Sequence, residues 1–227
     1  MFLQADTIAL AEGLLNQAQP ESINLWTMAQ YGGWIMIILG VLLAFACYIF
    51  IERLVVLKKA TQEDKSFMDR IRDYIHDGKI DSAVNLCRTT NTPSARMIEK
   101  GISRIGRPMQ DVQVAVENVG NLEVSILEKG LVLMATIAAG APMLGFLGTV
   151  LGMVQTFYNM AQTSGGVIEM SALSTGMYQA MVTTIGGLIV GILAMFAYNM
   201  LVARIDRVVR LLESRTMEFM DLLNEPA

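Results

Sequence analysis

Three long runs of apolar residues, separated by segments rich in charge, dominate the pattern of hydrophobic and polar positions along the chain. The first run lies within residues 25–51, the second begins near Gly130 and the third ends near Ala203. A run of about 20 apolar residues lets a helix cross the hydrocarbon core of a bilayer. The pattern therefore predicts an all-α integral membrane protein with three transmembrane helices.

The polar stretch after the first run has apolar residues at helical spacing. Residues 65–75 and 80–87 each predict a short helix, and the polar triplet at 91–93 is expected to end the second. A third short helix is expected from Ser94 to near Gly106. This segment therefore predicts a set of short amphipathic helices rather than an extended loop.

Two longer amphipathic patterns adjoin the second and third spans. From Asp111 onward, a stripe interrupted only by Gly120 predicts one helix that continues into the second span. The third span is expected to continue as a helical tail. The stripes consist of Val112, Val116, Val119, Leu122 and Ile126 before the second span and of Ile205, Val208, Leu212 and Phe219 after the third, with Arg207, Arg210 and Glu213 elsewhere on the tail.

The basic residues predict the orientation in the membrane. Residues 52–129 hold 13 of the 17 Lys and Arg, and residues 204–215 hold the other 4. Because positive residues resist translocation, both segments are expected in the cytoplasm of a bacterium, with the N-terminus in the periplasm and the spans in the inner membrane. The predicted parts are an N-terminal arm (1–24), transmembrane helix 1 (25–51), a cytoplasmic helical segment (52–128), transmembrane helix 2 (129–161), a periplasmic linker (162–171), transmembrane helix 3 (172–203) and a cytoplasmic C-terminal helix (204–227).

The remaining composition argues against an enzyme. The chain contains no glycine-rich phosphate loop, catalytic triad or metal-ligand cluster, so no catalytic residue, cofactor or metal is expected. Cys47 lies in the first span and Cys87 in the cytoplasmic segment, where a disulfide between them is not expected. His76 is interpreted as a solvated surface residue. The net charge is −4, and no nucleic-acid partner is expected.

Small and weakly polar residues recur at steps of three and four in the second and third spans. In lipid, such faces let helix backbones approach closely, and hydroxyl groups can bond across helices. Either the faces serve ordinary helix packing, or they surround a narrow interior that something else occupies. They comprise Gly145, Gly148, Thr149, Gly152 and Thr156 in the second span, and Gly176, Ala180, Thr183, Thr184, Gly187, Gly191 and Ala194 in the third.

Carboxylate, basic and imidazole side chains are missing from the same spans. Between Gly130 and Ala203 the only acidic, basic or imidazole side chain is Glu169, which is expected in the outer linker. Proton carriers in membranes ordinarily depend on buried Asp, Glu or His. This chain therefore cannot relay protons through its own carboxylates, and a partner would have to bring the titrating group to a path lined by threonines.

Pro142, residues 144–152 (LGFLGTVLG) and residues 177–188 (MYQAMVTTIGGL) resemble the two hallmark stretches of the MotA/TolQ/ExbB proton-channel family. Three spans fit its ExbB and TolQ members best, since MotA-type members usually have four. The resemblance implies a ring, commonly a pentamer, around the single transmembrane helices of an ExbD or TolR partner whose membrane Asp carries protons. Thr149 and Thr184 match the pore-lining threonines of the family.

Two positions depart from the family pattern. Gln179 stands where the family often has Glu, and Leu193 stands where it often has Pro, so less kinking of the third span is expected. The residues expected along the proton pathway are Thr149, Thr184, Thr183, Gln179 and Thr156. The residues expected in helix packing and contact with the partner helix are Pro142, Gly145, Gly148, Gly152, Gly176, Gly187 and Gly191.

The function expected from this resemblance is that of the ring subunit of an ExbB-ExbD-like proton channel or motor. It would use the proton motive force to energise TonB-dependent transport across the outer membrane. Its partners would be copies of itself, an ExbD-like single-span protein with a membrane Asp, a TonB-like protein and the lipid bilayer. A TolQ-like role in the Tol-Pal envelope system and a structural membrane scaffold without conduction are the alternatives. A secondary transporter is disfavoured because the chain shows no inverted repeat.

Overall fold

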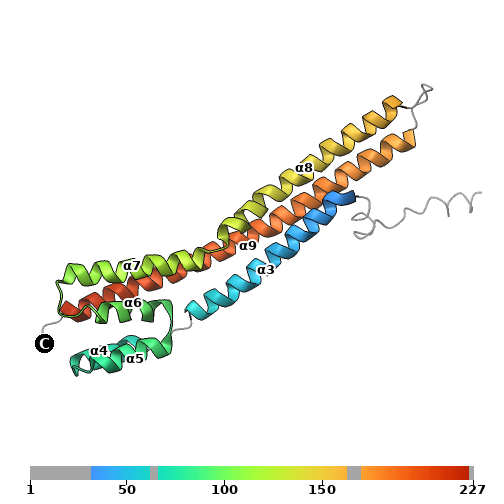
Figure 1. The fold of residues 1–227 in the computed structure, drawn as a ribbon. Coiled ribbons are helices and arrows are strands. Elements are labelled where there is room, and N and C mark those ends of the chain that lie inside the picture. The colour runs from blue at the N-terminus through green and yellow to red at the C-terminus, as the bar shows by residue number, and fades with distance from the viewer. Residues whose placement is uncertain (1–31, 62–65, 163–169, 225–227) are drawn as a thin grey trace, which may run out of the picture. The chain divides into compact units, whose positions relative to one another are not determined.

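The computed structural model describes residues 32–61, 66–162 and 170–224, and within these ranges the chain forms helices and no strand (Figure 1). The predicted arm at 1–24, the predicted start of the first span and Glu169 lie outside the described residues. The helices are α3 (Gly33–Thr61), α4 (Phe67–His76), α5 (Ile80–Thr90), α6 (Pro93–Ile102), α7 (Met109–Glu128), α8 (Leu131–Gln162) and α9 (Met170–Asn224).

Three of these helices carry an apolar stretch long enough to cross a membrane, namely α3, α8 and α9. They have 29, 32 and 55 residues, against the need for about 20. Many of their large apolar side chains are exposed, among them Ile37, Phe146 and Phe196 at 70%, 66% and 71%. Such exposure is unfavourable in water but not in lipid. The predicted all-α membrane protein with three long apolar helices agrees with this fold, whereas the ring stays a prediction.

The helix before the second span is interrupted, which corrects the expectation of one continuous helix from Asp111. Helix α7 ends at Glu128 and α8 begins at Leu131, with Gly130 at a φ of +90°. This backbone conformation is accessible to glycine but strained for residues with a Cβ. The break therefore occurs at Gly130 and not at Gly120, which lies within α7.

Arg53 of α3 forms a hydrogen bond with a carbonyl group in the last turn of helix α7. The helix continues past residue 51, where the first span was predicted to end, as far as Thr61. The Arg53 Nη1 group donates to the carbonyl oxygen of Ile126 at 3.3 Å. Carbonyl groups in the last turn of a helix lack intrahelical partners, and a cation there also interacts favourably with the helix dipole. The residue is buried, at 9% exposure, and this contact joins α3 to α7.

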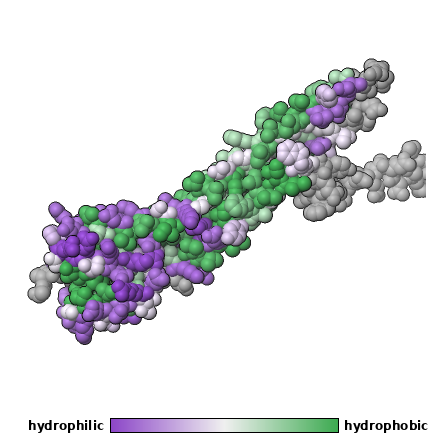
Figure 2. Space-filling view, viewed as in Figure 1, coloured by the Kyte–Doolittle hydropathy of each residue, from purple (hydrophilic) through white to green (hydrophobic). Residues whose placement is uncertain are grey.

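One compact unit, Gly40–Met143 with Leu188–Ala227, contains the polar helices α4–α7. Figure 2 shows hydrophilic residues gathered on the surface over these helices. Helix α6 begins at Pro93, with the Thr92 hydroxyl accepting from the Ala95 N–H at 3.3 Å, and ends at Ile102, before the predicted Gly106. The predicted apolar side of the tail is confirmed, since all four of its residues are buried. The core of this unit includes Phe67, Ile71, Ala83, Cys87, Ile98, Ile102, Val116, Ile205, Val208, Leu212 and Phe219.

The apolar stripe predicted on α7 is only half buried. Val112 and Val116 are buried, but Leu122 and Ile126 are exposed by 60% and 49%. Glu123 is buried in their place, at 5% exposure. Its carboxylate accepts two hydrogen bonds from the Arg96 guanidinium, each of 2.6 Å. A buried ion pair needs such bidentate geometry to offset its desolvation, and here it joins α6 to α7.

Cys87 is enclosed in the same core, at 1% exposure. Burial, with the Glu99 carboxylate as a smaller cause, raises the pKa of the thiol from 9.0 to about 12. Because the thiolate is the reactive species, a protonated buried thiol reacts slowly with alkylating agents.

In a Cys47→Ser variant, which leaves Cys87 as the sole cysteine, we expect iodoacetamide at pH 8 to label the denatured chain and not the folded protein. Raising the pH from 7 to 9.0 should accelerate labelling of the denatured chain alone, since the folded thiol retains its proton until pH values near its raised pKa of about 12. Mass spectrometry of the intact protein measures the adduct. Stoichiometric labelling of folded protein at pH 8 would contradict this burial.

Candidate functional site

The other compact unit joins the start of α3 to two adjacent helical segments, Leu144–Gln162 of α8 and Met170–Gly187 of α9. Small residues on the two segments face each other, and the pairing runs antiparallel. A Cβ on Gly152 would lie 3.1 Å from the Ala180 Cβ, and one on Gly148 would lie 2.8 Å from the Thr183 Cβ. Farther toward the linker, Gly176 lies against Thr156. The small faces predicted on both spans therefore pack against each other within one chain.

The closest backbone approach is at Gly145. A Cβ at this position would lie 2.9 Å from the Thr183 carbonyl oxygen and 3.0 Å from the Cα of Gly187. Both neighbours belong to the main chain of α9, so they could not move aside as a flexible side chain can. Lipid provides no hydrophobic force between helices, and close van der Waals contact of small residues takes its place.

Two further predicted packing residues, Pro142 and Gly191, meet in the unit that contains α4–α7. A Cβ on Gly191 would lie 2.5 Å from the Pro142 Cγ and 3.1 Å from the carbonyl oxygen of Ala138. Proline has no N–H, so the Ala138 carbonyl has no donor one helical turn later. Helix α8 nevertheless continues through Pro142, and α9 is likewise continuous through Leu193.

The close approach of α8 and α9 at Gly145 brings three threonine hydroxyls together. The Thr149 and Thr184 hydroxyls hydrogen-bond to each other, and each lies 3.3 Å from the carbonyl oxygen of Gly145. Thr183 is more deeply buried and donates to the Ala180 carbonyl at 2.7 Å. The pairing of Thr149 with Thr184, which are 35 residues apart in sequence, follows from the antiparallel register of the two helices.

The Thr149 and Thr184 hydroxyls can still form a hydrogen bond with a third group. Each hydroxyl has one proton and two acceptor lone pairs. One hydroxyl donates to the other, and the second donates to the Gly145 carbonyl, so both protons are engaged while lone pairs stay open. The half-buried pair can thus accept a hydrogen bond from an incoming acid, and a rotated hydroxyl can donate to its anion.

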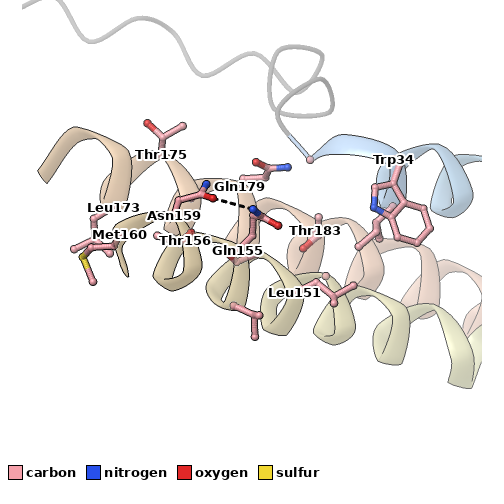
Figure 3. Close-up of a pocket in the computed structure, with 16 residues that line it drawn as sticks. Trp34, Leu151, Gln155, Thr156, Asn159, Met160, Leu173, Thr175, Gln179 and Thr183 are labelled. Atoms are coloured by element: carbon pink, nitrogen blue, oxygen red, sulfur yellow. Dashed lines mark hydrogen bonds between the residues drawn. The ribbon is translucent and has the colours of Figure 1, made fainter. Parts of the chain in front are cut away.

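A hollow of about 820 Å³ lies in the same unit (Figure 3). Of the predicted pathway residues, Thr156, Gln179 and Thr183 line it, whereas Thr149 and Thr184 do not. Its full lining is Gly32, Trp34, Ile35, Gly148, Leu151, Gly152, Val154, Gln155, Thr156, Asn159, Met160, Leu173, Thr175, Gly176, Gln179 and Thr183. The five predicted pathway residues therefore fall into two groups within the unit.

Three polar residues of the hollow were missed at the sequence level: Gln155, Asn159 and Thr175. The Gln155 Nε2 group donates to the Asn159 Oδ1 atom at 2.9 Å, as Figure 3 shows. Their spacing of one helical turn was a usable signal, since amides four residues apart in an apolar span share a face. Gln179 is exposed, and its Nε2 atom lies 3.0 Å from the position of a Cβ on Gly33, near the start of α3.

The hollow and the hydroxyl pair contain amides, hydroxyls and carbonyls but no carboxylate or imidazole. Among the described residues, no three His, Cys, Asp or Glu side chains gather in a way that could hold a metal ion. The chemistry available is hydrogen bonding to water or to a group supplied from outside.

The chain is similar in sequence to a known family of proton channels. The model of a family described as the MotA/TolQ/ExbB proton channel family matches residues 89–214. An ExbB homolog of Methanothermobacter thermautotrophicus is 28% identical over 180 residues, which cover 79% of this chain and 63% of that protein. The biopolymer transport protein ExbB of Aquifex aeolicus is 39% identical over 79 residues, covering 35% and 52%.

A third relative aligns over almost its whole length. The Tol-Pal system protein TolQ of Haemophilus influenzae is 25% identical over 207 residues, covering 85% of this chain and 90% of that protein. By contrast, the chain spans only about half to two thirds of the Aquifex and Methanothermobacter relatives.

The packing at Gly145 predicts a position-specific effect of adding a methyl group. Gly145→Ala should destabilise the protein by about 1–3 kcal/mol, the usual cost of overpacking, because the new Cβ meets the main chain of α9. Gly140→Ala is the matched control on the same helix, since nothing lies within 4 Å of its Cβ position. The control should be neutral or stabilising, because alanine favours helix.

Thermal loss of the monodisperse peak in size-exclusion chromatography compares both variants with the parent protein. Equal midpoints for Gly145→Ala and Gly140→Ala would show that α8 and α9 do not approach closely at Gly145.

Proposed function

Because the chain belongs to the MotA/TolQ/ExbB proton channel family, we propose that it is the ring subunit of an ExbB-ExbD-like proton channel or motor. In this role it uses the proton motive force to energise TonB-dependent transport across the outer membrane. The family is one of channels rather than of enzymes.

The observation that carries this proposal is a hydroxyl pair in spans that have no carboxylate, basic or imidazole side chain. Helix α8 contains no Asp, Glu, Lys, Arg or His, and neither does α9 before Arg204. A proton that crosses the membrane here must be carried by a group from another chain. The membrane Asp of an ExbD-like single-span protein supplies such a group.

Thr149 and Thr184 can form a hydrogen bond with that Asp in both of its protonation states. When the carboxyl group is protonated, its O–H donates to the hydroxyl oxygen of Thr149 or Thr184. When it is ionised, one hydroxyl turns from its partner and donates to the carboxylate. The pair therefore stabilises both protonation states without changing its own charge.

Gln179, Thr156 and Thr183 contribute polar groups to the hollow. An amide both donates and accepts hydrogen bonds but does not titrate near neutral pH. Gln179 can thus orient water, and the proton-carrying function rests on the partner's Asp alone. This accounts for an amide where the family often has a carboxylate.

The assembly proposed is a homopentameric ring in the bacterial inner membrane, with the N-terminus in the periplasm and the C-terminus in the cytoplasm. The exposed apolar side chains of α8 and α9 supply surface for lipid, neighbouring copies and the partner helix, and the basic residues of 52–129 and 204–215 support the orientation. A TonB-like protein completes the set of partners.

A TolQ-like role in the Tol-Pal envelope system is the second candidate. It is favoured by the relative from Haemophilus influenzae, which aligns over 90% of its own length. Expression of this chain in bacteria that lack either ExbB or TolQ separates the two roles. Restored TonB-dependent uptake supports the first role, and restored resistance to detergents supports the second.

Replacing Thr149 or Thr184 with Val should leave assembly intact and lower proton flux by about 10- to 100-fold. A hydrogen bond to a charged group contributes about 1.5–3 kcal/mol, which gives this range. Thr216→Val is the matched control, because it makes the same isosteric change on α9, where its hydroxyl bonds only the Leu212 carbonyl. Flux is measured in liposomes from the decay of an imposed pH gradient. Unchanged flux in both variants would exclude these hydroxyls from the pathway.

Co-expression with an ExbD-like single-span protein should yield a stable complex whose flux disappears when the partner's membrane Asp is replaced by Asn. The expectation follows from the lack of Asp, Glu, Lys, Arg and His in α8 and in α9 before Arg204. Co-purification and liposome flux test it. A ring that never captures such a partner, and conducts nothing, would favour the structural scaffold.

A further inference from the structure

A basic pocket lies between α3 and α9 in the unit that contains both segments. It has a volume of about 460 Å³ and is lined by Leu57, Lys58, Thr61, Arg204 and Arg207. Three of these five residues are cations and none is an acid. The pocket shares no residue with the hydroxyl pair or with the hollow beside Gln179, neither of which has a basic residue.

The three pocket cations have no ion-pair partner among the described residues, a property that they share with Lys59 and Arg210 on the same two helices. Within residues 32–61, 66–162 and 170–224, Lys58, Arg204 and Arg207 form no ion pair or side-chain hydrogen bond. By contrast, ion pairs of 2.6–3.1 Å engage Arg53, Lys79, Arg88, Arg96 and Arg215. Like charges gathered around one pocket repel each other, so an anion bound there is stabilised by all three.

Exposed apolar residues precede the cations on the same helix faces. On α3, Tyr48, Ile51 and Val55 lead to Lys58 at helical spacing, with exposures of 64%, 61% and 51%. On α9, Leu193, Phe196 and Met200 lead in the same way to Arg204, with exposures of 52%, 71% and 47%. The cations therefore stand where each apolar face ends, which is the level of the lipid headgroups.

We propose that this pocket binds the headgroup phosphate of an anionic phospholipid, whose acyl chains lie along the exposed apolar faces of α3 and α9. A free phosphate ion would satisfy the three cations but would leave those faces uncovered. Basic pockets between membrane helices are suited to anionic headgroups for this reason. The proposal depends only on the membrane-spanning character of the two helices, and it stands apart from proton conduction.

The test is native mass spectrometry of the full-length protein in detergent, titrated with dioleoylphosphatidylglycerol or dioleoylphosphatidylcholine. The anionic lipid should bind first and more tightly. At about 1 kcal/mol for each cation that contacts the headgroup in the pocket, Lys58→Gln should weaken binding roughly fivefold and Arg204→Gln/Arg207→Gln roughly 25-fold.

Lys59→Gln and Arg210→Gln are the matched controls. Both are exposed, lie on the same two helices and remove the same charge, but neither residue lines the pocket. They should bind the anionic lipid as the parent protein does. An equal loss in these controls would show diffuse attraction to a basic surface and overturn the pocket, as would equal binding of the zwitterionic lipid.

Glycerol 3-phosphate separates the two sources of phosphate. At the same concentration as the lipid it should not displace bound phosphatidylglycerol, since it has no acyl chains to contact the apolar faces. Displacement that disappears in Arg204→Gln/Arg207→Gln would assign the pocket to a soluble phosphate anion and overturn the lipid proposal.

Discussion

The contact between the α8 and α9 backbones at Gly145 is the constraint on which the candidate site depends. In lipid, helices gain nothing from burying apolar surface against each other, so their association depends on close contact and a few hydrogen bonds. A Cβ on Gly145 would lie 2.9 Å from the Thr183 carbonyl oxygen, which leaves no room for a larger residue. The same approach brings Thr149 and Thr184 within hydrogen-bonding distance.

The distribution of charge follows from the same physics. In the unit that holds α4–α7, cations are paired where burial demands it, as with Arg96 and the buried Glu123. In the unit that holds the hydroxyl pair, the described part of α8 and α9 carries no charged side chain at all. Hydroxyls and amides form hydrogen bonds with one another there, and their oxygens keep open lone pairs. Among the described residues, the pocket cations Lys58, Arg204 and Arg207 form no ion pair, and they line one pocket together.

Much of the fold could be predicted from local patterns. The three apolar stretches, the short helices and the buried side of the tail followed from hydropathy and periodicity, because these are properties of neighbouring residues. The break at Gly130 was missed because glycine inside a helix and glycine at a break look alike until φ is known. The exposure of Leu122 was missed because Glu123 has its partner on another helix.

The sequence by itself determined that α3, α8 and α9 are apolar enough to span a membrane and that no Asp, Glu, Lys, Arg or His lies between Gly130 and Glu169. Only the tertiary structure decided that Thr149 pairs with Thr184, that Gln155 shares a hollow with Gln179, and that Lys58 joins Arg204 and Arg207. Each of these sets combines residues far apart in the chain. Their meeting depends on the register between helices, which small residues set through close contact and which periodicity along one helix does not encode.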